Sequence, residues 1–214
     1  MRVALMQPYW CTAAGYFRLL ACTDLFIFHD TAQFIKGGWI HRNKLRLADG
    51  SWAWCTLPIK VPRSTSQIRE MEWQLGEKGV TEKQKRRFPV LWRNSHYYMP
   101  LWQPVGYIAH NVGAIAKDLR CGAEIKFASG LGGIDPCLGG QDQVIDICRS
   151  VGATEYVNAP GGRSLYDSAA FAAAGIKLKI LCDYPNHESV VERIAQMGAT
   201  AVRAEIDEYC RFDS

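Results

Sequence analysis

Two short apolar runs, each ending in polar residues, constrain the fold of this 214-residue chain more than any other feature. Four apolar residues in a row are typical of a strand that is buried on both faces of a parallel sheet. The runs are residues 3–6, followed by Gln7, Pro8 and Tyr9, and residues 25–28, followed by His29 and Asp30. Ligands usually bind beyond the strand ends of open α/β sheets, so the sequence predicts a site at this edge.

Strand and helix patterns alternate along the rest of the chain. The Asp49-Gly50 pair predicts a tight hairpin between residues 44–47 and 52–55. We expect further strands at residues 52–57, 68–74, 125–128, 155–158 and 176–181, a helical middle at about residues 80–122, and helices at residues 140–152 and 167–174. This succession indicates a single α/β domain over residues 1–214, with a mixed or mostly parallel sheet flanked by helices. A nucleotidyltransferase-like sheet is one form of it.

Composition places the chain among ordinary globular proteins, with 48% hydrophobic and 21% charged residues. No apolar run is long enough for a membrane helix, and the N-terminus lacks a secretory pattern, so we expect a cytoplasmic location and no membrane insertion. The eight cysteines include no C-x-x-C pair, so most should be reduced, buried residues. A nucleophilic role for Cys11 is a less favoured alternative, suggested by its position just after the Gln7 to Tyr9 turn.

The candidate site gathers proton-transfer groups and ligand-binding groups. A histidine suits a general base near neutral pH, and a cation beside tryptophan suits an anionic or sugar-like ligand. The candidate catalytic residues are His29, Asp30 and His41. The candidate substrate-binding residues are Gln7, Tyr9, Tyr16, Lys36, Trp39, Arg42 and Asn43, with Asn158, Arg163 and Tyr166 as a second wall beside the turn at residues 160–163. A metal held by the candidate catalytic residues is a weaker alternative, because no close ligand spacing supports it.

A basic segment stands apart from these residues. Lys83, Lys85, Arg86 and Arg87 precede Trp92, Arg93, His96, Tyr97 and Tyr98. Cations interleaved with aromatic residues could bind phosphates and stack bases. We favour the alternative of an amphipathic helix over residues 82–92, broken at Pro89, with Phe88, Leu91 and Trp92 packed inward. The chain's net charge of +4 is small for a dedicated nucleic-acid binder.

Several spaced motifs resemble the WbqC-like protein family. They are Met6-Gln7-Pro8-Tyr9, Gly15-Tyr16-Phe17, Asp24-x-Phe26 leading to Asp30, Gln33-x-x-Lys36-x-x-Trp39-x-x-Arg42-Asn43, Gly161-Gly162-Arg163-x-Leu165-Tyr166 and Gly175-Ile176. The resemblance spans about residues 1–181 and implies a bacterial protein of surface-polysaccharide or other specialised biosynthesis. This chain departs from the family pattern at residues 11–14, at Thr31, at His41 and after Asp183. The substrate could therefore differ, so natural-product tailoring is as plausible as surface-sugar chemistry.

The sequence thus predicts a group-transfer enzyme of acyl, aminoacyl or nucleotidyl type. Arg42, Lys36 and Arg163 would bind an anionic or nucleotide- or sugar-linked substrate, and no particular cofactor is indicated. The nucleotidyl alternative lacks the histidine pair of nucleotidyltransferases. The other alternative is a non-catalytic recognition module for a carrier protein, a tRNA or a nucleotide-linked intermediate. Convergence of the cations with Asp30 in one deep pocket would favour the enzyme.

Overall fold

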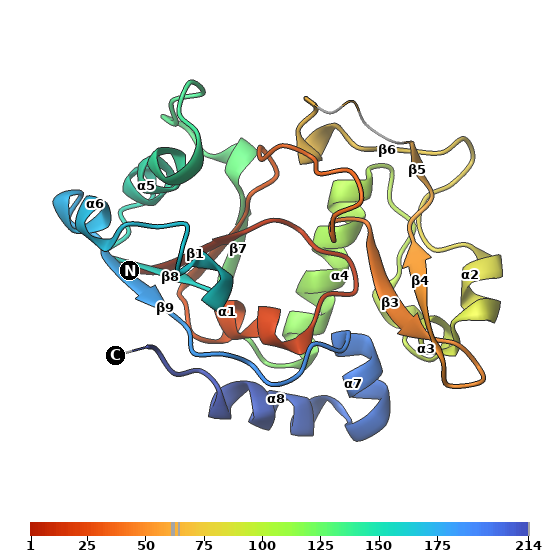
Figure 1. The fold of residues 1–214 in the computed structure, drawn as a ribbon. Coiled ribbons are helices and arrows are strands. Elements are labelled where there is room, and N and C mark those ends of the chain that lie inside the picture. Colours follow the sequence, from red (N-terminus) through yellow and green to blue (C-terminus); the bar gives the residue numbers. More distant parts are fainter. Residues whose placement is uncertain (61–62, 64, 214) are drawn as a thin grey trace.

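A five-stranded parallel sheet forms the centre of the computed structural model, which describes residues 1–60, 63 and 65–213 (Figure 1). Its strands are β1 (Arg2–Met6), β2 (Leu25–Phe28), β7 (Glu124–Phe127), β8 (Glu155–Asn158) and β9 (Lys177–Ile180). They lie in the order β7-β2-β1-β8-β9, and every neighbouring pair is parallel. The expected α/β fold with a mostly parallel sheet is confirmed.

Helices cover both faces of the sheet, which explains why its central strands are apolar throughout. Val3 and Leu5 of β1 pack with residues of α5 (Gly140–Ser150) and α6 (Ser168–Ala173). These two helices lie near each other on one side of the sheet (Figure 1). Ala4 belongs to the opposite core. That core contains residues of α1 (Phe17–Ala21), α4 (Pro104–Asp118), α7 (Val190–Met197) and α8 (Ala199–Glu208). Side chains on both faces of β1 are therefore removed from water.

The order of the strands creates a switch point in the sheet. The chain adds β2 and β7 on one side of β1, then crosses back to add β8 and β9 on the other side. The segments that follow β1 and β8 therefore leave in opposite directions. In doubly wound sheets a crevice opens at this point, at the carboxyl ends of the strands.

A lobe of short elements is inserted between β2 and β7 (Figure 1). It holds the antiparallel pairs β3 (Arg42–Arg46) with β4 (Trp52–Thr56) and β5 (Ile59–Lys60) with β6 (Glu72–Trp73), followed by α2 (Glu82–Arg87) and α3 (Pro89–Arg93). The predicted Asp49-Gly50 hairpin is confirmed, and Gly50 has the positive φ of 84° that its turn needs. The predicted break at Pro89 separates α2 from α3.

The strand expected over residues 68–74 is mostly wrong. Ile68–Glu70 forms a 3-10 turn, because the side chain of Glu70 accepts a hydrogen bond from the Gln67 backbone and draws the chain into a local turn. Only Glu72–Trp73 pairs as a strand. Within the described residues, four more 3-10 turns connect the elements, at Ala14–Tyr16, Ser95–Tyr97, Ala128–Gly130 and Pro160–Gly162.

The two C-terminal helices were not expected from the sequence. α7 and α8 follow β9 and bury Val190, Val191, Val202 and Ile206 against the sheet's second core. The eight cysteines, all within the described residues, are free thiols. None of the helices in the described residues combines the length and apolar character that crossing a bilayer requires.

Candidate functional site

Two adjacent cavities lie at the carboxyl ends of β1 and β8. One, of about 430 Å³, is bordered by His29 and is called here the His29 cavity. The other, of about 390 Å³, is bordered by Arg18 and is called the Arg18 cavity. Their walls share Met6, Tyr9, Ala159 and Gly161. The crevice that the strand order predicts is therefore present, and Tyr9 stands in the wall common to both halves.

His29 is held in its cavity by contacts on two sides. Its backbone N–H donates to the Met6 carbonyl at 2.9 Å, and its Nε2 lies 3.0 Å from Oε1 of Gln143 on α5. Burial lowers the pKa of the imidazole, although the Gln143 contact and the nearby Asp30 charge oppose the shift. The ring is therefore neutral at neutral pH. In the tautomer with its proton on Nε2, Nδ1 carries a lone pair that can accept a proton.

Two amide side chains add unpaired donors to the His29 cavity. Tyr9 donates its hydroxyl to Oε1 of Gln7 at 3.2 Å, and the Ala159 N–H donates to Oδ1 of Asn158 at 2.7 Å. Among the described residues, neither Nε2 of Gln7 nor Nδ2 of Asn158 has a partner, and neither atom is fully buried. Both residues border the cavity. Their amide groups can therefore donate to a bound polar ligand.

Arg18 brings a buried positive charge to the second cavity. Its Nη1 donates to the carbonyls of Cys182 (2.7 Å) and Tyr209 (3.1 Å), and its Nε donates to Gly15 (3.2 Å). The side chain is only 2% exposed. Within the described part of the chain it meets no carboxylate, and its Nη2 has no partner yet is not fully buried. The Tyr184 ring also lies against the guanidinium, with Cζ 4.9 Å from the ring centre, and Asp183, which borders the same cavity, is paired with Arg163. Neutral carbonyls and an aromatic ring only partly offset a buried cation, so the free Nη2 favours an anionic group.

Sequence reasoning did not select Arg18. It follows the Gly15-Tyr16-Phe17 motif, but a single arginine in an apolar helix gives no pattern of its own. The one available signal was its position on α1, directly after β1 in a strand–helix unit. Gly15 and Tyr16 border the same cavity, and Tyr16 donates its hydroxyl to the Gln7 carbonyl at 2.9 Å.

The other predicted proton-transfer groups lie outside both cavities, and Nδ1 of His41 is buried without a hydrogen-bond partner among the described residues. Asp30 is 2% exposed, and its two carboxylate oxygens accept from the backbone N–H (2.9 Å) and hydroxyl (2.5 Å) of Ser129. His41 packs against Phe34, and burial lowers its pKa to about 4. Burial raises the pKa of the Cys11 thiol, so the thiol stays protonated. None of the three borders either cavity.

Two of the predicted substrate-binding residues, Trp39 and Asn43, border a third recess. This recess has a volume of about 400 Å³ and shares His187 with the Arg18 cavity. Asn43 donates to the Cys11 carbonyl at 2.5 Å. Arg42 stacks on Trp54, with its Cζ 4.4 Å from the ring centre, and donates to the carbonyls of Gly37 and Gly38. Lys36 is exposed and borders none of the three spaces.

Arg163 lies away from these cations. It forms ion pairs with Asp183 (2.9 Å) and Asp213 (2.7 Å), and these two partners raise its pKa. Its neighbour Tyr166 borders the His29 cavity. The structure thus brings together Gln7, Tyr9, Tyr16, His29, Asn158 and Tyr166 at the switch point, and it does not bring Asp30, Lys36, Arg42 and Arg163 into one pocket.

No metal centre is formed by the residues that the structure describes, since no three side chains of His, Cys, Asp or Glu lie close enough together. Fold and crevice define a doubly wound α/β protein with a partly polar crevice at its switch point.

The chain belongs to the WbqC-like protein family, whose model matches residues 7–190. It is similar to the uncharacterized protein Rv1507c of Mycobacterium tuberculosis (strain ATCC 25618 / H37Rv), with 26% identity over 189 residues that cover 83% of this chain and 80% of that protein. No solved structure matches the chain.

Proposed function

We propose that the protein is a group-transfer enzyme whose small-molecule substrate carries an anionic group, such as a nucleotide- or sugar-linked compound. One observation carries the proposal. Unpaired polar atoms of Gln7, His29 and Asn158, from three different strand ends, border a crevice whose other half holds the buried Arg18 cation. A bacterial surface-polysaccharide or specialised-metabolite pathway is the setting that the family resemblance suggests.

In such a reaction the Arg18 cavity would bind the donor and the His29 cavity would bind the acceptor. Arg18 would bind a phosphate or carboxylate of the donor, because its Nη2 has no partner among the described residues and a charged donor forms strong hydrogen bonds to anionic oxygens. The Tyr9 and Tyr16 rings, 6.0 Å apart between centres, give a surface for a sugar or base beside it. His29 would then stand at the acceptor end, in the adjoining cavity.

His29 would act as general base in the transfer step. Its Nδ1 takes the proton of an acceptor hydroxyl or amine while the acceptor oxygen or nitrogen bonds to the carbon or phosphorus of the transferred group. The bond from that atom to the donor breaks, and the leaving group departs with the electron pair. A positioned base of this kind accelerates transfer by about 10²- to 10⁴-fold.

The test begins with a thermal-shift screen against nucleotides, nucleotide sugars, and acyl and aminoacyl donors. A ligand at about one hundred times its dissociation constant should add about 2.7 kcal/mol to the unfolding free energy, which is several degrees in Tm. A compound that shifts Tm is then offered with acceptors, and turnover is followed by mass spectrometry.

Two histidine variants decide the role of His29. His29→Gln should slow turnover at least about 100-fold with little change in ligand affinity. His96→Gln is the control, because His96 is 60% exposed and borders neither cavity. Equal turnover of His29→Gln and wild type, or no shift with any small molecule, would overturn the proposal.

A further inference from the structure

The basic segment noted in the sequence carries the whole net charge of the protein. Residues 82–93 contain five basic side chains and one acidic side chain, a balance of +4. The remaining residues contain 20 of each sign, so they are neutral together. A charge that is modest for the whole chain is therefore concentrated on two short helices, where it creates a local positive field.

The fold presents this segment rigidly. The Thr81 hydroxyl accepts from the Gln84 N–H at 3.1 Å, and Oε1 of Gln84 accepts from the Thr81 N–H at 2.8 Å, which caps α2. Phe88 and Leu91 are buried and anchor the helices to the core. Lys85 pairs with Glu82 at 2.7 Å. The other cations, Lys83, Arg86, Arg87 and Arg93, are exposed and, among the described residues, pair with no carboxylate.

Trp92 faces outward, which corrects the expectation that it packs inward. It is 65% exposed, because the break at Pro89 turns α3 so that Val90 and Leu91, and not Trp92, enter the core. Beside it lies a recess of about 520 Å³, bordered also by Arg86, Pro89 and Arg93. Glu82 and Lys85, which pair with each other, complete the border. An exposed indole that shares a recess with two arginines offers a stacking surface with cations for adjoining phosphates.

We propose that this surface, formed by α2 and α3 and called here the α2–α3 face, binds single-stranded nucleic acid. The arginines and Lys83 contact backbone phosphates, and one unpaired base stacks on Trp92. A duplex hides its base faces, so it does not use the indole. A protein partner fits less well, because Trp92 is the one large exposed apolar side chain around this recess, whereas protein interfaces have an apolar core. This inference does not depend on the proposed enzyme activity.

Fluorescence anisotropy with a labelled 12-nucleotide single-stranded RNA tests the proposal at several salt concentrations. Wild type should bind with an affinity that falls steeply with salt, because each phosphate contact on a single strand contributes about −0.7 to the logarithmic slope. Trp92→Ala should bind about 5- to 150-fold more weakly with the slope unchanged. Trp102→Ala is the matched control, since Trp102 is 81% exposed and also lies near a cation, Lys78, but lies outside the recess.

A second pair of variants tests the charges at equal net charge. The double variant Arg86→Glu/Arg93→Glu should abolish binding, and Lys117→Glu/Arg120→Glu, on exposed positions elsewhere, should leave it intact. Single-stranded DNA of the same sequence should behave like the RNA, and a duplex should bind without any effect of Trp92→Ala. Equal loss in both double variants, no loss with Trp92→Ala, or equally tight binding of polyglutamate would overturn the proposal. The last result would point to an acidic protein partner.

Discussion

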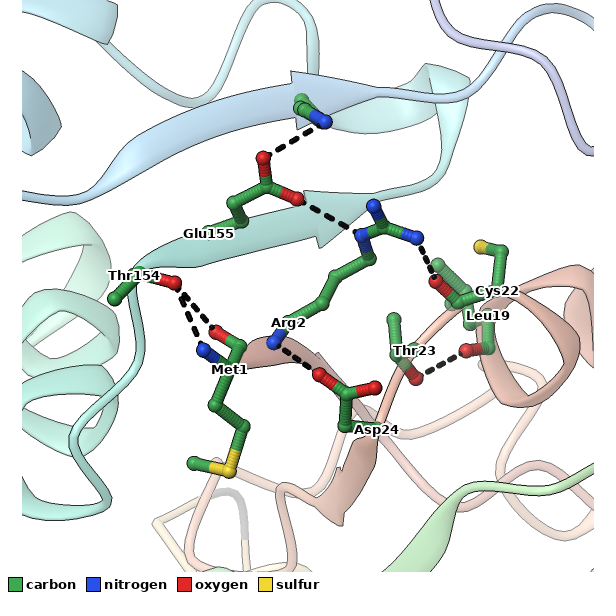
Figure 2. Close-up of polar contacts among 9 residues, drawn as sticks. Met1, Arg2, Leu19, Cys22, Thr23, Asp24, Thr154 and Glu155 are labelled. Atoms are coloured by element: carbon green, nitrogen blue, oxygen red, sulfur yellow. Dashed lines mark hydrogen bonds and ion pairs between the residues drawn. The ribbon is translucent and has the colours of Figure 1, made fainter.

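Polar groups at the amino ends of β1 and β8 are paired with one another, whereas some of those at the carboxyl ends have no partner among the described residues. At the amino end, Arg2 donates to Glu155 at 2.8 Å and to the Cys22 carbonyl at 3.0 Å, and the N-terminal ammonium donates to Thr154 (Figure 2). At the carboxyl end, Arg18 has an unpaired nitrogen beside a cavity. The same strands thus close one edge with internal contacts and leave the other edge able to bind a ligand.

The closed end explains why the sheet holds its register. Glu155 at the start of β8 joins Arg2 of β1 to Lys179 of β9, with distances of 2.8 Å to each. The Arg2 N–H donates to Asp24 at 2.7 Å, just before β2 (Figure 2). These contacts tie four chain segments together at one edge. The opposite edge can then leave polar atoms unpaired without loosening the strands, which is the usual relation between scaffold and site.

The largest difference in unfolding free energy should appear when Arg18, at the open end, and Arg2, at the closed end, are each replaced by methionine. Arg18→Met removes hydrogen bonds to three partly buried carbonyls and should lower the unfolding free energy by about 3 kcal/mol. Arg2→Met at the closed end should cost about 1 kcal/mol, because its side chain is 38% exposed. Urea denaturation measures both. A larger loss for Arg2→Met would reverse the comparison.

A smaller loss of stability should distinguish alanine substitutions at two adjacent glycines, Gly161 and Gly162, at the carboxyl end of β8. A Cβ on Gly162 would lie 2.4 Å from Nδ2 of Asn158, so Gly162→Ala should cost about 2 kcal/mol. A Cβ on Gly161 would meet no described atom within 4 Å, so Gly161→Ala should change stability by less than about 0.5 kcal/mol. Thermal unfolding compares the pair. Equal Tm values would show that Asn158 is not held against Gly162.

The smallest effect is a pH dependence at the closed end. Hydrogen bonds from Lys179 and then Arg2 lower the pKa of Glu155 to about 2, below its usual 4.5. The contribution of Glu155 to stability is therefore present above about pH 4.5 and is lost as the pH falls toward 2. Since the carboxylate is partly exposed, Glu155→Gln should cost only about 1 kcal/mol at pH 7.

Denaturation at pH 7 and at pH 3 measures this dependence. The difference between wild type and Glu155→Gln should shrink in acid. Glu208→Gln is the control, because Glu208 is exposed and forms no ion pair among the described residues. A difference that grows in acid would show that the carboxylate is not stabilised by its two cations.

Much of the fold could be predicted because it follows from local patterns. The apolar runs of β1 and β2 are recognisable as buried strands, and the Asp49-Gly50 turn is specific for a hairpin. The positions of Gln7, Tyr9, His29 and Asn158 at one sheet edge followed from strand ends alone. Parallel strands bring their carboxyl ends to the same edge whatever lies between them.

The rest depended on tertiary contacts that the sequence does not display. Asp30 looked like a site residue, but Ser129, 99 positions later, accounts for both of its oxygens. Arg163 looked free, but two distant aspartates pair with it. Arg18 has the sequence context of an ordinary helical residue, and only the fold brings the carbonyls of Cys182, after β9, and Tyr209, after α8, to its guanidinium. Partners far along the chain decide which polar residues remain available.

The most direct measurement is a calorimetric titration of the ligand from the thermal-shift screen into Gly161→Leu. Gly161 borders both cavities and has room for a side chain, so leucine should fill the crevice without destabilising the fold. Gly130→Leu, in the 3-10 turn that follows β7 and outside both cavities, is the matched control. We expect Gly161→Leu to lose about 100-fold or more in affinity while Gly130→Leu binds like wild type. Unchanged binding by a folded Gly161→Leu would show that the ligand site is not at the switch point.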